Sequence, residues 1–75
     1  MKELLEYLAR LLVDLPDQVE VRELQGEHNT LLELRVAPDD MGKVIGRGGK
    51  TAQAIRTLVK AAGTREGKRV TVDII

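Results

Sequence analysis

The spacing of apolar residues changes along this chain from the period of a helix to that of a strand, which restricts the elements it can form. In residues 4–15, leucines recur three and four positions apart. This spacing is typical of an amphipathic helix, which we expect to end before Pro16. Residues 19–22 and 30–37 alternate apolar and polar side chains. They predict two strands, joined as an antiparallel hairpin by the turn at residues 26–29.

Helical spacing returns in the second half of the chain. Residues 38–45 predict a short helix, and residues 50–62 predict a longer one that Gly63 ends. After a polar loop at residues 64–68, residues 69–75 alternate again and predict a last strand. The order is α-β-β-α-α-β. A helical crossover between the last two strands makes them parallel, so we expect a single two-layer α+β domain with helices on one face of a three-stranded mixed sheet.

The amino-acid composition excludes several classes of function. The 75 residues include no cysteine and no serine, which excludes disulfides, thiolate metal sites and Cys or Ser nucleophiles. A lone histidine, His28, does not make a zinc site, and a lone aromatic residue, Tyr7, disfavours base-stacking platforms. No apolar run approaches the roughly 20 residues of a membrane span, and no signal peptide is recognisable. We expect a cytoplasmic domain that is not an enzyme and uses no cofactor or metal.

Charge is unevenly distributed although the net charge is zero. Residues 1–40 hold four basic and ten acidic residues, whereas residues 41–75 hold eight basic and two acidic ones. The two halves therefore carry net charges of −6 and +6. This asymmetry favours one positive working region on a neutral body.

A glycine-rich segment, residues 46–49, separates the two helices of the second half and is called the glycine loop below. It reads Gly-Arg-Gly-Gly and is followed by Lys50. Glycines lack Cβ atoms, so a phosphate can approach the backbone closely, and the N–H groups that begin the next helix attract anions. Arg47 and Lys50 add positive charge. The glycine loop is therefore expected to bind a phosphodiester backbone.

Two alternatives involve neighbouring residues. Residues 49–51 end like a nucleotide-binding P-loop, but that motif needs a glycine where Val44 stands, and it follows a strand directly. Asp39 and Asp40 form a possible metal pair, although capping of the short helix explains both residues. We favour capping and expect no nucleotide hydrolysis.

The segment Val44-Ile45-Gly46-Arg47-Gly48-Gly49 resembles the KH-domain signature, hydrophobic-Ile-Gly-x-x-Gly. The order of elements resembles the bacterial, type II form of that fold, and the whole chain is similar to the small stand-alone bacterial KH proteins of the KhpA type. One departure is Ala52, which stands where the signature usually has isoleucine.

The resemblance implies binding of about four nucleotides of single-stranded RNA at the glycine loop. It implies that Val44 and Ile45 form core and groove wall, and that residues 64–68 form a variable loop facing the glycine loop across a groove. Arg56 and Lys60 are four apart on the long helix, and two readings of them stay open: an extension of the positive track, or an ordinary solvated helix face. The RNA-binding residues expected in this way are Val44, Ile45, Gly46, Arg47, Gly48, Gly49, Lys50, Arg56, Arg65, Lys68 and Arg69.

The resemblance also implies an RNA chaperone in post-transcriptional control. The partners that it implies are a second copy of the chain or a larger Jag-type KH protein. An alternative reading is a protein-interaction module, in which the glycine loop serves subunit contacts and opposite charges steer the pairing.

Overall fold

Six regular elements follow one another in the order that the apolar spacing predicts, and they form the predicted α+β fold. The computed structural model describes all 75 residues. Its helices and strands are α1 (Lys2–Leu12), β1 (Glu20–Gln25), β2 (Thr30–Arg35), α2 (Met41–Ile45), α3 (Lys50–Arg65) and β3 (Val70–Ile74). One-turn 3-10 segments precede β1, α2 and α3 at Pro16–Gln18, Pro38–Asp40 and Arg47–Gly49.

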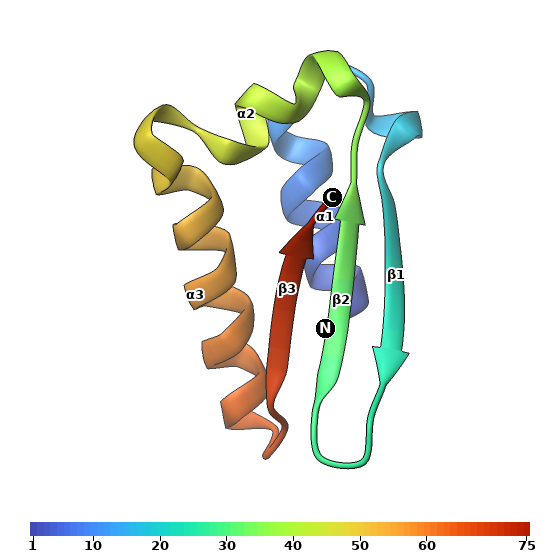
Figure 1. Cartoon of the computed structure of the whole chain (residues 1–75), viewed down its shortest axis with the longest axis vertical. Coiled ribbons are helices and arrows are strands. Elements are labelled where there is room, and N and C mark those ends of the chain that lie inside the picture. The colour runs from blue at the N-terminus through green and yellow to red at the C-terminus, as the bar shows by residue number, and fades with distance from the viewer.

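The three strands form one mixed sheet in the order β1-β2-β3. β1 pairs antiparallel with β2, and β3 pairs parallel with β2, with Leu32 opposite Val72. The parallel pair requires a crossover, which α2 and α3 supply. In Figure 1, α1 lies behind the sheet and α3 runs along β3, with α2 above the sheet between the end of β2 and the start of α3. None of these helices combines the length and the apolar content that crossing a membrane takes.

The core lies between the sheet and the helices. On β2 and β3 the residues that alternate inward are buried, and they meet the buried face of α1 and of α3. Each fully buried Val, Leu or Ile contributes about 1.5–3 kcal/mol relative to exposure. The largest fully buried apolar residues of this cluster are Leu5, Leu32, Leu34, Val44 and Val59.

The first helix is shorter than its leucine spacing predicts. α1 ends at Leu12, and Val13 is already extended, with φ −96° and ψ 160°. The reason is a competing hydrogen bond, because the Leu15 N–H donates to the carboxylate of Asp40 at 3.0 Å. The helix therefore ends three residues before the position at which Pro16 alone would have ended it.

The last helix is longer than predicted, because Gly63 does not end it. α3 continues to Arg65, and Gly63 is buried inside it. A Cβ atom at Gly63 would lie 2.7 Å from Cγ2 of Val70 and 3.2 Å from the carbonyl oxygen of Lys68. This glycine thus permits β3 to approach α3 closely. The predicted loop 64–68 is correspondingly shorter, since its first two residues are helical.

Candidate nucleic-acid interface

The glycine loop has a backbone shape that only glycines adopt without strain. Gly46, Gly48 and Gly49 have φ values of +76°, +64° and +79°. A Cβ atom at Gly46 would also overlap the side chain of Thr51, so this position is closed to larger residues. A Cβ atom at Gly48 or Gly49 would meet nothing within 4 Å. The outer side of the loop is therefore open to a ligand.

Unpaired N–H groups make this loop a site for an anion. The Gly49 N–H donates to the Gly46 carbonyl at 3.2 Å, but no backbone carbonyl accepts from the N–H groups of Arg47 and Gly48. Successive amides in a turn of this kind form a concave anion-binding nest. The side chains of Arg47 and Lys50 are exposed beside it. The arrangement suits one or two phosphate groups of a polymer.

The apolar residues of the signature support the glycine loop from beneath. Val44 is fully buried, so it belongs to the core and does not form the groove wall, whereas Ile45 is half-buried. Ala52, where the signature usually has isoleucine, is 2% exposed. It lies in the interior beside Ile55 on the buried face of α3 rather than on the ligand-facing surface.

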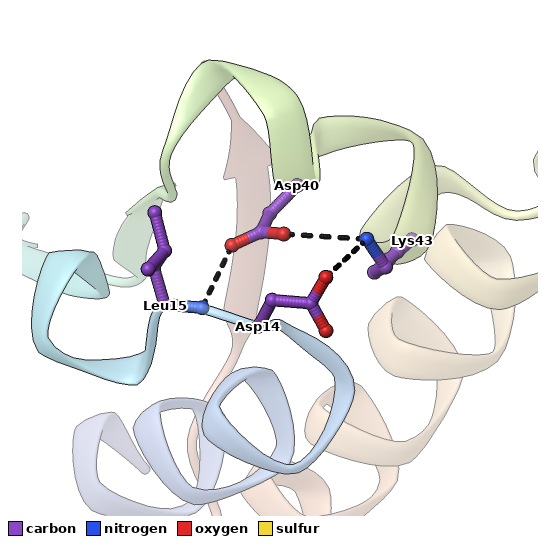
Figure 2. Close-up of polar contacts among 4 residues, drawn as sticks. All are labelled: Asp14, Leu15, Asp40 and Lys43. Atoms are coloured by element: carbon purple, nitrogen blue, oxygen red, sulfur yellow. Dashed lines mark hydrogen bonds and ion pairs between the residues drawn. The ribbon is translucent and has the colours of Figure 1, made fainter.

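A polar cluster of Asp14, Leu15, Asp40 and Lys43 joins the end of α1 to the start of α2, as Figure 2 shows. The Asp40 carboxylate is 2% exposed and accepts from the Leu15 N–H at 3.0 Å. Lys43 Nζ lies 3.5 Å from Asp40 and 2.9 Å from Asp14. This cluster, called the Asp40 cluster below, holds α2 and therefore the entrance to the glycine loop. Asp40 occupies the N-cap position of α2, as predicted, but neither its side chain nor that of Asp39 makes a capping hydrogen bond to the helix.

The Asp40 cluster favours the charged forms of its members. Burial by itself raises the pKa of Asp40, but hydrogen bonds from the backbone of Leu15 and Asp14 and the pairing with Lys43 outweigh it. The pKa of Asp40 therefore lies below its ordinary value. The hydrogen bond and charge of Asp14 in turn raise the pKa of Lys43. Lys43 is thus committed to two carboxylates and is not a free cation.

A groove of about 1180 Å³ lies between α3 and the first half of β3. Its cationic lining consists of Arg56, Lys60, Lys68 and Arg69, and no aspartate or glutamate lines it. Arg56 crosses from helix to strand, because its Nε donates to the Val72 carbonyl at 3.4 Å. This region is called the α3–β3 groove below. A negatively charged polymer would meet only positive or neutral side chains there.

The structure separates the expected basic residues into two groups. Arg47 lies just before α3 and Lys50 is its first residue, whereas Lys68 and Arg69 follow its last turn. The resemblance implied that the second group faces the glycine loop across a groove, but the two groups lie at opposite ends of α3. Arg65 is the last residue of α3 and does not line the α3–β3 groove.

The α3–β3 groove also contains residues that were not selected from the sequence. One of them is His28, which belongs to the predicted turn at residues 26–29 and lines the groove. Its position follows from the parallel pairing of β2 with β3, in which Thr30 lies opposite Val70. The order of elements predicted this parallel pairing, but no local sequence pattern fixes the register that places His28 at the groove.

The basic residues of the second half are nearly all free of ion pairs. Among them only Lys43 forms a salt bridge. Their charges are therefore available to a ligand. The free ones are Arg47, Lys50, Arg56, Lys60, Arg65, Lys68 and Arg69.

Helices on one face of a three-stranded mixed sheet, with a Gly-x-x-Gly loop between the second and third helix, define a KH domain of the type II order. The model of the KhpA/KhpB KH-domain family matches residues 2–74. The chain belongs to the KhpA/KhpB KH-domain family, which confirms the resemblance seen in its signature.

Curated relatives match the chain along its full length. The RNA-binding protein KhpA of Clostridium acetobutylicum is 60% identical over 75 residues, which is 100% of both chains. The RNA-binding protein KhpA of Caldanaerobacter subterraneus subsp. tengcongensis is also 60% identical, again over 100% of both chains. The protein of the same name from Aquifex aeolicus is 45% identical, over 100% of this chain and 95% of its own.

Proposed function

We propose that this protein is a non-catalytic single-stranded RNA-binding protein, in which residues 1–75 act as one KH domain and the glycine loop clamps the RNA backbone. The observation that carries the proposal is the loop itself. Three residues with positive φ expose two unpaired N–H groups between the side chains of Arg47 and Lys50. The names of the full-length relatives, which are RNA-binding proteins, support the same ligand.

RNA bases and the following phosphates would occupy the α3–β3 groove. Arg56, bonded to the Val72 carbonyl, stands at the end of the groove nearer the glycine loop, and Lys68 and Arg69 stand at its far end. These cations bind RNA through charge, and no carboxylate lines the groove to compete with the RNA. A few phosphate contacts of this kind give weak binding with little sequence discrimination.

Weak binding by one domain favours pairing with a second. Two linked sites raise the effective affinity without a new contact, because the second contact becomes intramolecular. We propose a homodimer or a heterodimer with a larger Jag-type KH protein, acting as a general RNA chaperone in the bacterial cytoplasm. In this role the glycine loop must stay outside the subunit contact.

The test is fluorescence anisotropy of a short unstructured RNA against the wild type and Arg47→Asp/Gly48→Asp. A Cβ atom at position 48 would meet no atom within 4 Å, and aspartate tolerates positive φ better than most residues, so the variant should fold. We expect salt-sensitive binding by the wild type and its loss in the variant. Circular dichroism checks that both proteins are folded.

The matched control is Arg10→Asp/Gln18→Asp, which changes the net charge equally at exposed positions of the first half. It should bind RNA almost as the wild type does. Equal binding by the wild type and the loop variant would remove the glycine loop from the mechanism. Absence of binding by every protein would instead favour the interaction module, and sedimentation of the loop variant would then test subunit contacts.

A further inference from the structure

The tip of the β1–β2 hairpin, residues 26–29, lies beside the connection between α3 and β3. The Thr30 N–H donates to the Arg69 carbonyl at 2.8 Å. Because β2 and β3 run parallel from this point, both turns are at the same end of the sheet, opposite the glycine loop (Figure 1). His28 therefore borders the far end of the α3–β3 groove, together with Lys68 and Arg69.

We infer that an RNA strand held at the glycine loop continues along α3 to the hairpin tip, where one base stacks on the imidazole of His28. Lys60, Lys68 and Arg69 pair with the phosphates of this distal part. The inference rests on the proposed function and extends it to the length of RNA recognised. The 16 residues of α3 span about 24 Å. A KH loop clamps about four nucleotides, so a strand that covers both ends of the helix is longer.

The ring at the hairpin tip is the only one available to RNA in this groove. Tyr7, the chain's single aromatic residue, is on α1 and does not line the groove. RNA-binding proteins stack splayed bases on rings that include histidine. His28 is exposed, and the groove that it borders is lined by four cations and no carboxylate, which favours an RNA backbone nearby. A ring that can stack on a base and cations that can pair with phosphates therefore lie together at the far end of the groove.

The test compares a four-nucleotide and a twelve-nucleotide oligouridylate by fluorescence anisotropy. We expect the longer RNA to bind the wild type more tightly. His28→Ala should weaken binding of the longer RNA by roughly fivefold or more, the fold-change that corresponds to one lost base–ring stack. It should leave the shorter RNA unaffected. His28→Tyr, which keeps a ring, should restore the longer RNA to near the wild-type affinity.

Tyr7→Ala is the matched control, since it removes the other ring from a place outside the groove, and it should leave both affinities unchanged. Equal affinities of the wild type for the two RNAs, or equal binding of the longer RNA by His28→Ala and the wild type, would overturn the inference. If the shorter RNA still depends on Arg47 in that case, the proposed function stands. Binding of neither RNA would instead contradict the proposed function itself.

Discussion

Two glycines that lie inside helices, Gly42 and Gly63, have opposite surroundings. A Cβ atom at Gly42 in α2 would meet nothing within 4 Å, so no neighbouring helix requires this glycine. A Cβ atom at Gly63 would press on Val70 and on the backbone of Lys68. The Lys68 N–H donates back to the Gly63 carbonyl at 2.8 Å, which keeps that backbone in place. The same residue type is therefore dispensable at one site and required at the other.

Alanine at these two positions should change stability in opposite directions. We expect Gly42→Ala to raise the free energy of unfolding by up to about 1 kcal/mol, because glycine is a poor helix former. Gly63→Ala should lower it by about 1 kcal/mol or more, since overpacking outweighs the better helix propensity. Urea denaturation followed by circular dichroism measures both changes. If Gly63→Ala instead raises the free energy of unfolding, β3 can move away from α3 to accommodate the methyl group without loss of stability.

At the scale of elements, α2 depends on contacts with α1 more than on its own hydrogen bonds. It has only five residues, and isolated helices of that length do not persist in water. The Asp40 cluster joins it to the residues that follow α1 through one hydrogen bond, from Leu15 to Asp40, and one ion pair, between Lys43 and Asp14. The orientation of the glycine loop, which follows α2 directly, is therefore set by residues from the first half of the chain.

This contact predicts a specific response to acid. The folded-state pKa of Asp40 is below its ordinary value of 3.8, so its carboxylate stabilises the fold above the pKa of the unfolded chain. That contribution is lost as pH falls through the lower, folded-state pKa. Asp40→Asn should therefore lower the urea midpoint at pH 7, and the difference from the wild type should shrink as pH falls below 3.8.

Asp39→Asn is the control for this experiment, because Asp39 is exposed and forms no salt bridge or side-chain hydrogen bond. Its urea midpoints should follow those of the wild type from neutral pH to below pH 3.8. A difference between Asp40→Asn and the wild type that stays constant over this range would show that the carboxylate charge contributes nothing.

Helices and strands could be predicted from the sequence where one of their faces had to be buried. Their ends could not be predicted where a contact with a residue distant in the sequence determines them. Alternation in Val70 and Val72 identified a strand because its inward side chains need a core. The end of α1 was missed, since Leu15 bonds to a carboxylate 25 positions away. Gly63 was misread as a helix end because its close neighbour, Val70, is set by packing.

The candidate site divides in the same way. The glycine loop consists of consecutive residues, so it could be predicted directly from the sequence. The groove is not local, because Arg56 reaches Val72 and His28 arrives from the hairpin. The set of residues that line the groove depends on the register of the parallel pair β2 and β3, and no short segment of sequence determines that register.

For the whole molecule, the segregation of charge determines how binding responds to salt. Seven free cations are in the second half, whereas the acidic residues are concentrated in the first. Repulsion from those carboxylates is weak at the groove, since none of them lines it. The zero net charge of the chain therefore conceals a strongly positive binding surface.

The salt dependence of RNA binding should report how many of these cations contact phosphate. A single strand that neutralises about three charges gives a log–log slope near −2. Lys60→Gln or Lys68→Gln should each make the slope for a long RNA shallower by about 0.7. Lys2→Gln, on α1, should leave the slope unchanged. If none of the three substitutions changes the slope, the RNA does not bind in the α3–β3 groove.

The position of β3 at the end of the element order has a consequence for newly made chains. Chains leave the ribosome from the N-terminus, so β3 is the last element to emerge. One wall of the α3–β3 groove, and the strand that covers Gly63, are therefore missing until then. A chain stalled before Val70 carries the complete glycine loop but no groove behind it, and in a ribosome-bound binding assay it should hold RNA less well than the released protein. The emergence of β3 from the ribosome is then also the moment at which this protein can first bind RNA along the whole α3–β3 groove.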